Sequence, residues 1–357
     1  MMSKITKYFK ITFFRSLGSL PSILILYVTS KCNQKCNHCF YSASLNQKND
    51  LELDDYKNIS NEFGVIENLL IGGGEPFANI SFSKILTLFY TNNQTKLFSI
   101  PTNATLLPQM EGALSDIRAN CKDAFLNLYI SFDGMENTHN EIRQFPNAFN
   151  RSMNNLDYLL KKFEGDSKIR FFITTTLMSE NSNEIINLFN YVKNRFKNKV
   201  QFNMGLLRGE PKNPNLGLPH LNKISSIYSI ISKSHQFDTF TNKIRSLAMF
   251  GLKMNILLSN KQVIQCKAGE LIGVIYANGD VSSCELLPSV GNVLNGGFLK
   301  VWFSDEAKKQ KRKIMNKECV CTHGCFLTPS ITYSIYMPIF MIYFYIYAKK
   351  IMRKIHN

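Results

Sequence analysis

The chain has 357 residues, of which 45% are hydrophobic, and a formal net charge of +16. This hydrophobic content excludes a wholly disordered chain, and the length exceeds what a single hydrophobic core usually holds. Residues 300–357 contain eleven Lys and Arg against three Asp and Glu, which is half of the positive excess. The charge therefore belongs mainly to the C-terminal tail, and this uneven distribution argues against a nucleic-acid partner.

The nine cysteines gather towards the two ends of the chain. Residues 1–15 are basic, but the apolar run at residues 20–28 lacks the small-residue cleavage site of a secretory signal. Clustered cysteines without a secretory signal favour metal ligation in a reducing compartment over disulfides, so we expect a cytoplasmic protein. Cys121 has no neighbouring cysteine and is expected in the core.

Short runs of β-branched and aromatic residues predict six buried parallel strands, at residues 23–29, 68–71, 96–100, 126–132, 168–177 and 200–206. Apolar residues three and four positions apart predict helices between them, at residues 53–63, 81–90, 149–163 and 183–196. This alternation predicts an α/β fold with helices outside a parallel sheet. A partial (β/α)6 barrel is the expected closure, and a doubly wound open sheet is the alternative.

Changes in composition divide the chain further. We expect a basic N-terminal segment at residues 1–19, a barrel at 20–218, a helical connector at 219–258, a small domain at 259–328 and an aromatic, basic tail at 329–357.

A cysteine triplet follows the first predicted strand, with Cys32, Cys36 and Cys39 spaced C-x3-C-x2-C. Three thiolates in one short loop can each bind one iron of a [4Fe-4S] cubane and leave the fourth iron open for chemistry. A zinc site or a redox dithiol are the alternatives, but zinc prefers four ligands in pairs, and His38 lies between two of the cysteines. The triplet therefore favours a catalytic cluster.

Polar and glycine-rich sequences also end the next predicted strands. They are Gly72-Gly73-Gly74-Glu75-Pro76, then Thr102-Asn103, and then Ser131-Phe132-Asp133-Gly134 with His139 and Arg143 after it. Together with the triplet they resemble the radical S-adenosylmethionine (radical SAM) superfamily, with its GGEP and SxDG…HxxxR stretches. Position 104 is Ala where many members of that family have Gly.

This resemblance implies that Cys32, Cys36 and Cys39 hold the catalytic cluster that reductively cleaves S-adenosylmethionine. It implies that the cofactor is contacted by Gly72, Gly73, Gly74, Glu75, Asn103, Ser131, Asp133 and Arg143. It also implies an external electron donor such as flavodoxin or ferredoxin. His139 is expected to be a capping or core residue, outside the site.

Five further cysteines follow residue 260. Cys266, Gly279 and Cys284 have the spacing C-x12-G-x4-C, in a stretch that predicts a tight hairpin, and Cys319, Cys321 and Cys325 lie beyond it. The pattern resembles the SPASM/twitch domain, which binds auxiliary iron–sulfur clusters. Five cysteines suffice for one cubane, so we expect a single auxiliary [4Fe-4S] cluster on Cys266, Cys284, Cys325 and either Cys319 or Cys321. A structural zinc knuckle is the alternative.

The tail contains eighteen uncharged residues at 331–348, seven of them Tyr or Phe, followed by Lys349, Lys350, Arg353 and Lys354. This length is at the lower limit for a membrane-spanning helix, and Pro338 makes it a poor one. The composition fits a helix lying on the inner membrane face better than a spanning one, and a helix packed on the barrel is the other expectation for this segment.

The substrate is not determined by these patterns. A peptide or a sugar or envelope metabolite both fit an auxiliary-cluster enzyme, and Thr174, Thr176, Asn203 and Arg208 are candidates to face it. Many peptide-modifying members carry a recognition domain before the triplet, and 31 residues are too few for one. This count tilts the expectation slightly away from a self-contained peptide maturase, and a maturase that recruits its substrate through another protein stays open. A basic nucleic-acid-binding zinc protein is the non-enzymatic alternative.

Overall fold

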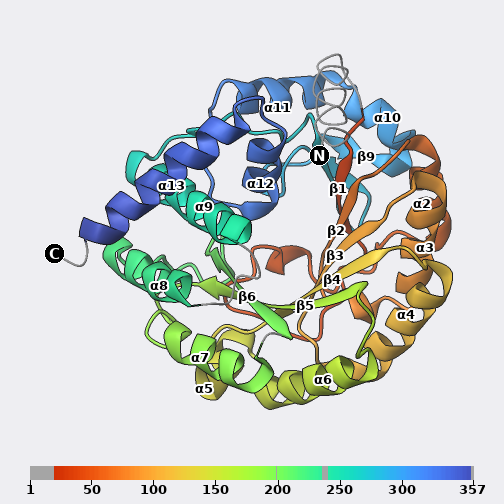
Figure 1. The fold of residues 1–357 in the computed structure, drawn as a ribbon. Helices are drawn as coiled ribbons and strands as arrows, with labels where there is room; N and C mark the ends of the chain where they lie inside the picture. The colour runs from red at the N-terminus through yellow and green to blue at the C-terminus, as the bar shows by residue number, and fades with distance from the viewer. Residues whose placement is uncertain (1–19, 198, 235–239, 355–357) are drawn as a thin grey trace.

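A computed structural model describes residues 20–197, 199–234 and 240–354 of the chain. The predicted basic N-terminal segment, residues 1–19, lies outside the described residues. In Figure 1 the described chain forms a ring, with strands on the inside and helices around the outside.

Six parallel strands follow one another around the inside of this ring: β1 (Ile23–Tyr27), β2 (Asn68–Gly72), β3 (Leu97–Thr102), β4 (Phe125–Ser131), β5 (Ile169–Leu177) and β6 (Val200–Leu206). Each pairs with its neighbours in sequence, so the sheet order runs β6-β5-β4-β3-β2-β1. An order without reversal puts every crossover on the same side of the sheet. The partial barrel is therefore confirmed, and the doubly wound alternative is wrong.

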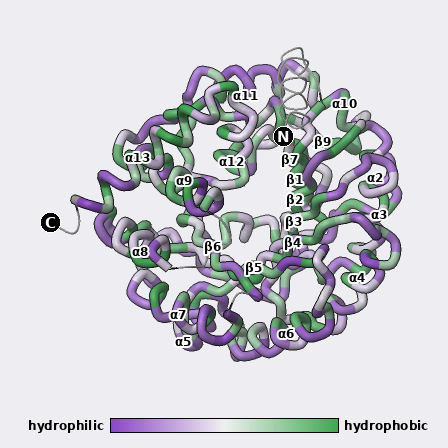
Figure 2. Tube along the Cα trace, in the orientation of Figure 1, coloured by the Kyte–Doolittle hydropathy of each residue, from purple (hydrophilic) through white to green (hydrophobic). Residues whose placement is uncertain are grey.

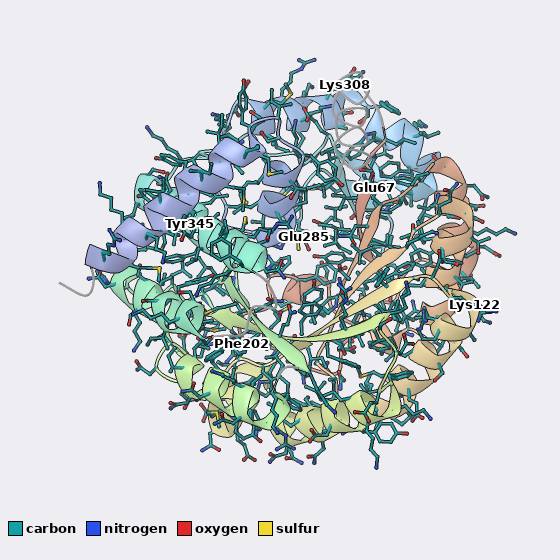
Figure 3. The ribbon with its side chains drawn as sticks, in the orientation of Figure 1. Glu67, Lys122, Phe202, Glu285, Lys308 and Tyr345 are labelled. Carbon is teal, nitrogen blue, oxygen red and sulfur yellow. The ribbon has the colours of Figure 1, made fainter. Side chains whose placement is uncertain are left out.

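The helices α2 (Leu53–Glu62), α3 (Phe82–Asn93), α4 (Leu107–Asn120), α5 (Glu136–Arg143), α6 (Ala148–Lys162) and α7 (Ile185–Phe196) connect these strands and cover the outside of the sheet. Helices α4 and α5 were not among the predicted ones. Hydrophobic residues run along the strands and the inward sides of the helices, while hydrophilic residues dominate the outer rim (Figure 2). Figure 3 likewise places Lys122 and Lys308 on the rim and Glu285 near the centre.

The C-terminal cysteine region joins the same sheet. Strand β7 (Ile272–Ile275) pairs in parallel with β1, and it forms an antiparallel hairpin with β8 (Asp280–Ser282), beside which lies β9 (Gly291–Asn292). Gly279 turns this hairpin with φ of +86°, a conformation that favours glycine. Helices α10 (Gly297–Trp302), α11 (Asp305–Met315) and α12 (Gly324–Thr332) follow. The strand pairing places the C-terminal cysteines beside the first barrel strand.

Three further helices cover the open side of the ring in Figure 1: α8 (Leu221–Lys233), α9 (Phe240–Ser259) and α13 (Met337–Lys354). Helix α13 packs along α9, and Phe344, Ala348 and Met352 form its buried stripe. A Cβ placed on Gly251 of α9 would lie 2.0 Å from the carbonyl oxygen of Phe344. The glycine thus permits the close approach of the two helices.

We predict that Gly251→Ala destabilises the protein, by about 1–3 kcal/mol, because the added methyl group forces the two helices apart. Gly112→Ala is the matched control, since Gly112 lies exposed in α4 with no atom within 4 Å of a built Cβ. Removing that helical glycine should stabilise the protein by about 0.5–1 kcal/mol. Denaturant unfolding measures both changes, and a Gly251→Ala protein as stable as wild type would contradict this packing.

Candidate functional site

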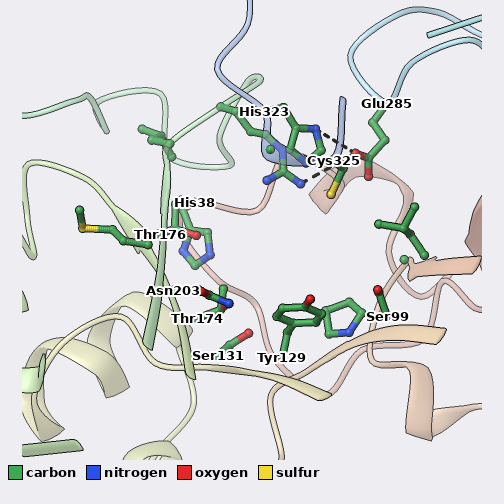
Figure 4. Close-up of a pocket in the computed structure, with 18 of the residues that line it drawn as sticks. His38, Ser99, Tyr129, Ser131, Thr174, Thr176, Asn203, Glu285, His323 and Cys325 are labelled. Atoms are coloured by element: carbon green, nitrogen blue, oxygen red, sulfur yellow. Dashed lines mark ion pairs between the residues drawn. The ribbon is translucent and has the colours of Figure 1, made fainter. Parts of the chain in front are cut away.

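The ring encloses a cavity of about 890 Å³. Its lining comes from residues along the strands, from the loops that follow them and from α8, α9 and α12, and Figure 4 shows part of it. The N-terminal cysteines and the glycine-rich loop line one part of the cavity. The C-terminal residues Glu285, His323 and Cys325 line another.

The cysteine loop after β1 is fixed by hydrogen bonds at both ends. Ser30 N donates to the Asp50 carboxylate at 2.9 Å, and Cys32 N donates to Asn46 Oδ1 at 2.9 Å. Cys39 N donates to the carbonyl of Cys36 at 3.2 Å, which turns the chain between them. All three predicted cysteines line the cavity.

The surroundings of these three thiols favour binding of a metal over free thiolates. Burial raises the pKa of Cys32 to about 12 and raises the pKa of Cys36 and Cys39 as well, so their thiolates need a cation beside them. In the described ranges, no three His, Cys, Asp or Glu side chains converge on a single-ion position. A cubane does not require such convergence, because each thiolate binds a different iron. The residues present therefore fit a [4Fe-4S] cluster.

The glycine run after β2 packs against the cysteine loop. A Cβ on Gly73 would lie 2.3 Å from the carbonyl oxygen of Thr29, and one on Gly74 would lie 2.1 Å from that of Lys31. Gly73 also has φ of +105°. Two hydrogen bonds join the loops, from Gly74 N to the Thr29 carbonyl and from Glu75 N to the Lys31 carbonyl, each 2.8 Å. Side chains here would separate the loops, which explains the glycines.

Glu75 ties the glycine loop to the end of β3. Its carboxylate accepts a hydrogen bond from the Thr102 hydroxyl at 2.7 Å and one from Asn103 N at 2.7 Å. Burial nevertheless raises its pKa to about 7, since these donors offset only part of the cost of desolvating the charge. Asn103 in turn donates to Asn33 Oδ1 in the cysteine loop, at 2.8 Å.

Ala104 adopts φ of +56°, a left-handed conformation that favours glycine. Its methyl group is fully buried, and its carbonyl accepts a hydrogen bond from Asn155 at 2.8 Å. The alanine is therefore held in place by its surroundings.

A buried ion pair lies next to Cys36 of the cysteine loop. Arg143 Nε donates to Asp133 Oδ2 at 2.7 Å, and Arg143 Nη1 approaches Cys36 Sγ at 3.7 Å. The Asp133 side chain is fully buried, and the guanidinium of Arg143 helps to hold its pKa below the usual range. Ser131 and Arg143 line the cavity, whereas Asp133 positions Arg143 from behind. His139 is also buried, and its Nδ1 accepts from Asp133 N at 3.1 Å.

Charged residues meet in the C-terminal part of the cavity. Glu285 accepts a hydrogen bond from the Tyr27 hydroxyl at 2.7 Å and lies 4.0 Å from Arg208 and 3.1 Å from His323 Nδ1 (Figure 4). Burial lowers the pKa of His323 well below its usual range, so the imidazole is neutral. Lys253 of α9 lines the same cavity. Glu285, His323 and Lys253 were missed from sequence, although Glu285 directly follows Cys284.

The C-terminal cysteines gather around one hydrophobic cluster, which Cys266, Cys284, Cys319 and Cys325 border. Cys321 is close enough to raise the pKa of both Cys266 and Cys284. Cys325 also lines the cavity. Four of these thiols fit one further cubane, while Cys121 is fully buried in the core as predicted.

Of the residues expected to face the substrate, Thr174, Thr176, Asn203 and Arg208 all line the cavity. Thr174 and Thr176 are two positions apart on β5, and side chains at that spacing lie on the same face of a strand.

The architecture and the paired cysteine regions define an iron–sulfur enzyme built on a partial α/β barrel. The sequence profile of the radical SAM superfamily matches residues 26–192, and the profile of the iron–sulfur cluster-binding SPASM domain matches residues 266–326. The chain belongs to the radical SAM superfamily and carries a SPASM domain. It therefore uses a [4Fe-4S] cluster with S-adenosylmethionine, and its SPASM domain is of the kind that binds auxiliary iron–sulfur clusters. These matches decide against the zinc-protein alternatives.

Among similar proteins, the cysteine-type anaerobic sulfatase-maturating enzyme of Clostridium novyi is 24% identical over 84% of both chains. The sporulation killing factor maturation protein SkfB of Bacillus subtilis is 22% identical over 85% of this chain and 70% of its own. Three other curated relatives are matched over only 54%, 49% and 30% of their length. The crystal structure of Streptococcus suis SuiB bound to S-adenosylmethionine has the same fold, with a TM-score of 0.59, 17% identity and coverage of 88% of this chain and 72% of that one.

The raised pKa of Glu75 predicts a pH dependence of stability in the cluster-free chain. Its pKa of about 7 in the fold exceeds the ordinary 4.5, so this residue's contribution is fully present at low pH and is lost as pH rises towards 7. Relative to Glu75→Gln, wild type should lose about 2 kcal/mol between pH 5 and pH 8. Urea unfolding at both values measures this difference, and a difference that is constant or grows with pH would contradict it.

Proposed function

We propose that this radical SAM enzyme abstracts hydrogen from a side chain of a peptide or protein substrate. A sugar or envelope metabolite is the alternative. The observation that carries the proposal is the juxtaposition of the two cysteine regions on one cavity, where a substrate can contact both. Support for a peptide comes from the relatives, since two of them are named as maturation enzymes and a similar structure holds its precursor peptide.

Cys32, Cys36 and Cys39 would hold the [4Fe-4S] cluster, which would supply the electron for reductive cleavage of S-adenosylmethionine and so allow the resulting 5′-deoxyadenosyl radical to abstract hydrogen from the substrate. The chain's own residues prepare this step. Gly72, Gly73 and Gly74 line the cavity beside the cysteine loop, where their backbone can contact the cofactor, and the Glu75 carboxylate is placed to receive its ammonium group.

Further polar residues complete the proposed cofactor site. Asn103 and Ser131 offer hydrogen bonds from the ends of β3 and β4. Arg143 supplies a positive charge beside Cys36, and Asp133 fixes its orientation. Cys36, Glu75 and Arg143 are buried at this end of the cavity, and a site with little access to water protects a reactive species from side reactions.

The C-terminal part of the cavity is proposed to bind the reacting portion of the substrate. It offers a carboxylate in Glu285 and cations in Arg208 and Lys253, and the threonines of β5 add hydroxyl groups. Such a lining can pair with amides and charged groups of a peptide, and with the hydroxyl groups of a sugar.

We also propose one auxiliary [4Fe-4S] cluster, held by Cys266, Cys284, Cys325 and Cys321. Cys321 is preferred over Cys319 as the fourth ligand because it lies close enough to Cys266 and Cys284 to raise the pKa of both thiols. Cys319 helps to raise the pKa of Cys266, and its thiol donates a hydrogen bond to Gln262 Oε1 at 3.5 Å.

The enzyme is proposed to work in the cytoplasm with an external one-electron donor such as flavodoxin or ferredoxin, because a cluster of this class must be reduced before each cleavage. Among the described residues, no helix is long and apolar enough to cross a membrane.

Anaerobic reconstitution followed by reduction should give 5′-deoxyadenosine from S-adenosylmethionine, since Cys32, Cys36 and Cys39 all line the cavity where the cofactor would bind. The Cys32/Cys36/Cys39→Ala triple variant should form none above the enzyme-free background, while Cys121→Ala, which changes a thiol outside the cavity, should remain active. Liquid chromatography measures the product. Equal product from wild type and the triple variant would refute the catalytic assignment.

The same assay separates the two substrate classes. Cells of the source organism grown on deuterated medium supply a peptide and protein fraction and a small-metabolite fraction. Deuterium should appear in 5′-deoxyadenosine with the first fraction, because hydrogen moves directly from the substrate to the nucleoside. Deuterium transfer from the small-metabolite fraction alone would overturn the peptide proposal and leave the radical SAM chemistry standing.

The ligand assignment predicts different losses of iron from two variants. In the background of the Cys32/Cys36/Cys39→Ala triple variant, only the auxiliary cluster remains, with about four irons per chain. Adding Cys321→Ala should remove most of this iron, whereas adding Cys319→Ala should retain it. Iron analysis and the absorbance of the thiolate-to-iron transitions measure the result, and the opposite ranking of the two variants would contradict the choice of Cys321.

A further inference from the structure

The outward side of α13 and the residues just before it carry a dense apolar surface. Seven of the eighteen exposed large hydrophobic residues in the described chain fall between positions 335 and 346. We call six of them the apolar face, each more than half exposed: Ile335, Tyr336, Ile339, Ile342, Tyr343 and Ile346. Isolated exposed apolar residues are ordinary, but a contiguous set of this size marks an interaction surface.

Helix α13 is apolar on two of its sides. Its buried stripe, which includes Phe344 and Ala348, packs on α9. The apolar face repeats every three or four residues on another side, as in Ile339, Ile342 and Ile346. Packing on the protein therefore accounts for one side of α13 and leaves the other uncovered in the described structure.

Positive charge continues from the apolar face. Lys349, Lys350 and Arg353 are exposed in the last turns of α13. The chain has no Asp or Glu after Glu318, so nothing in residues 319–357 offsets these cations. Isoleucine, tyrosine and then clustered lysine and arginine match the boundary of an anionic bilayer, where apolar groups enter the acyl region and cations remain at the headgroups.

We propose that α13 docks this enzyme on an anionic lipid surface, with the apolar face inserted and the three cations at the headgroups. The helix lies along α9 rather than projecting from the protein, so it sits parallel to the bilayer and does not cross it. Anionic lipid is favoured over a protein partner because cations without neighbouring acids suit a surface of one charge sign.

This orientation has a consequence for the cavity. Helix α9 supplies Ser246, Phe250 and Lys253 to the cavity lining, and it carries α13 on its other side. Packed helices lie about 8–10 Å apart, so docking brings the cavity within about one helix layer of the bilayer. A substrate presented at the membrane surface is then close to the site of hydrogen abstraction.

Vesicle co-sedimentation of the full reconstituted chain tests the docking. The wild type should bind vesicles of phosphatidylcholine with phosphatidylglycerol at least tenfold better than vesicles of phosphatidylcholine alone, and added salt should weaken binding. Ile339→Ser/Ile342→Ser/Ile346→Ser should lose at least tenfold in binding to the mixed vesicles. Lys349→Gln/Lys350→Gln/Arg353→Gln should lose at least tenfold on the mixed vesicles and little on the neutral ones.

The matched control is Lys308→Gln/Lys309→Gln/Arg312→Gln, which removes the same charge from exposed positions of α11. It should bind as the wild type does. Equal binding to both kinds of vesicle, or equal loss in the two charge variants, would overturn the proposal. So would a wild-type dimer that the isoleucine variant converts to monomers without any change in vesicle binding, because the apolar face would then cover a second copy of the chain.

Discussion

The close packing of two backbone loops is the constraint on which the rest of the site depends. The cysteine loop after β1 and the glycine loop after β2 meet because neighbouring parallel strands end at the same edge of the sheet. The carbonyl oxygens of Thr29 and Lys31 occupy the space that a Cβ atom at positions 73 and 74 would need. The glycine loop of this contact lines the cavity, and the hydrogen bonds of Glu75 connect the loop to the end of β3.

Electrostatics then assigns different roles to charged residues that look alike in sequence. Asp133 and Glu75 are both buried acids, but Asp133 is paired with Arg143 and stays ionised, whereas Glu75 has only neutral donors and a raised pKa. Arg143 links its ion pair to Cys36, so the charge of a cluster thiolate has a fixed cation beside it. A buried cation of this kind is tolerated because Asp133 compensates it.

Helix α9 lies between the cavity and helix α13 on the outer surface of the protein. One side contributes to the cavity, and the other holds α13 through the close approach at Gly251. The SPASM region closes the same cavity because β7 adds to the barrel sheet beside β1. The two domains expected from composition thus share one sheet and one cavity, and a substrate bound there lies against both.

The amino-acid sequence alone determined the order and type of the barrel elements, because buried strands and amphipathic helices leave periodic patterns that need no knowledge of distant contacts. It also determined the cysteine triplet and the loops at the strand ends, whose residue types and order carry their chemistry. Helices α4 and α5 were missed because α5 has few apolar residues and α4 a weakly periodic set. Only the tertiary structure decided that Asp133 supports Arg143, that Glu285 and Lys253 line the cavity, and that α13 has a second apolar side. Each depends on contacts between residues far apart in the chain, which local patterns do not encode.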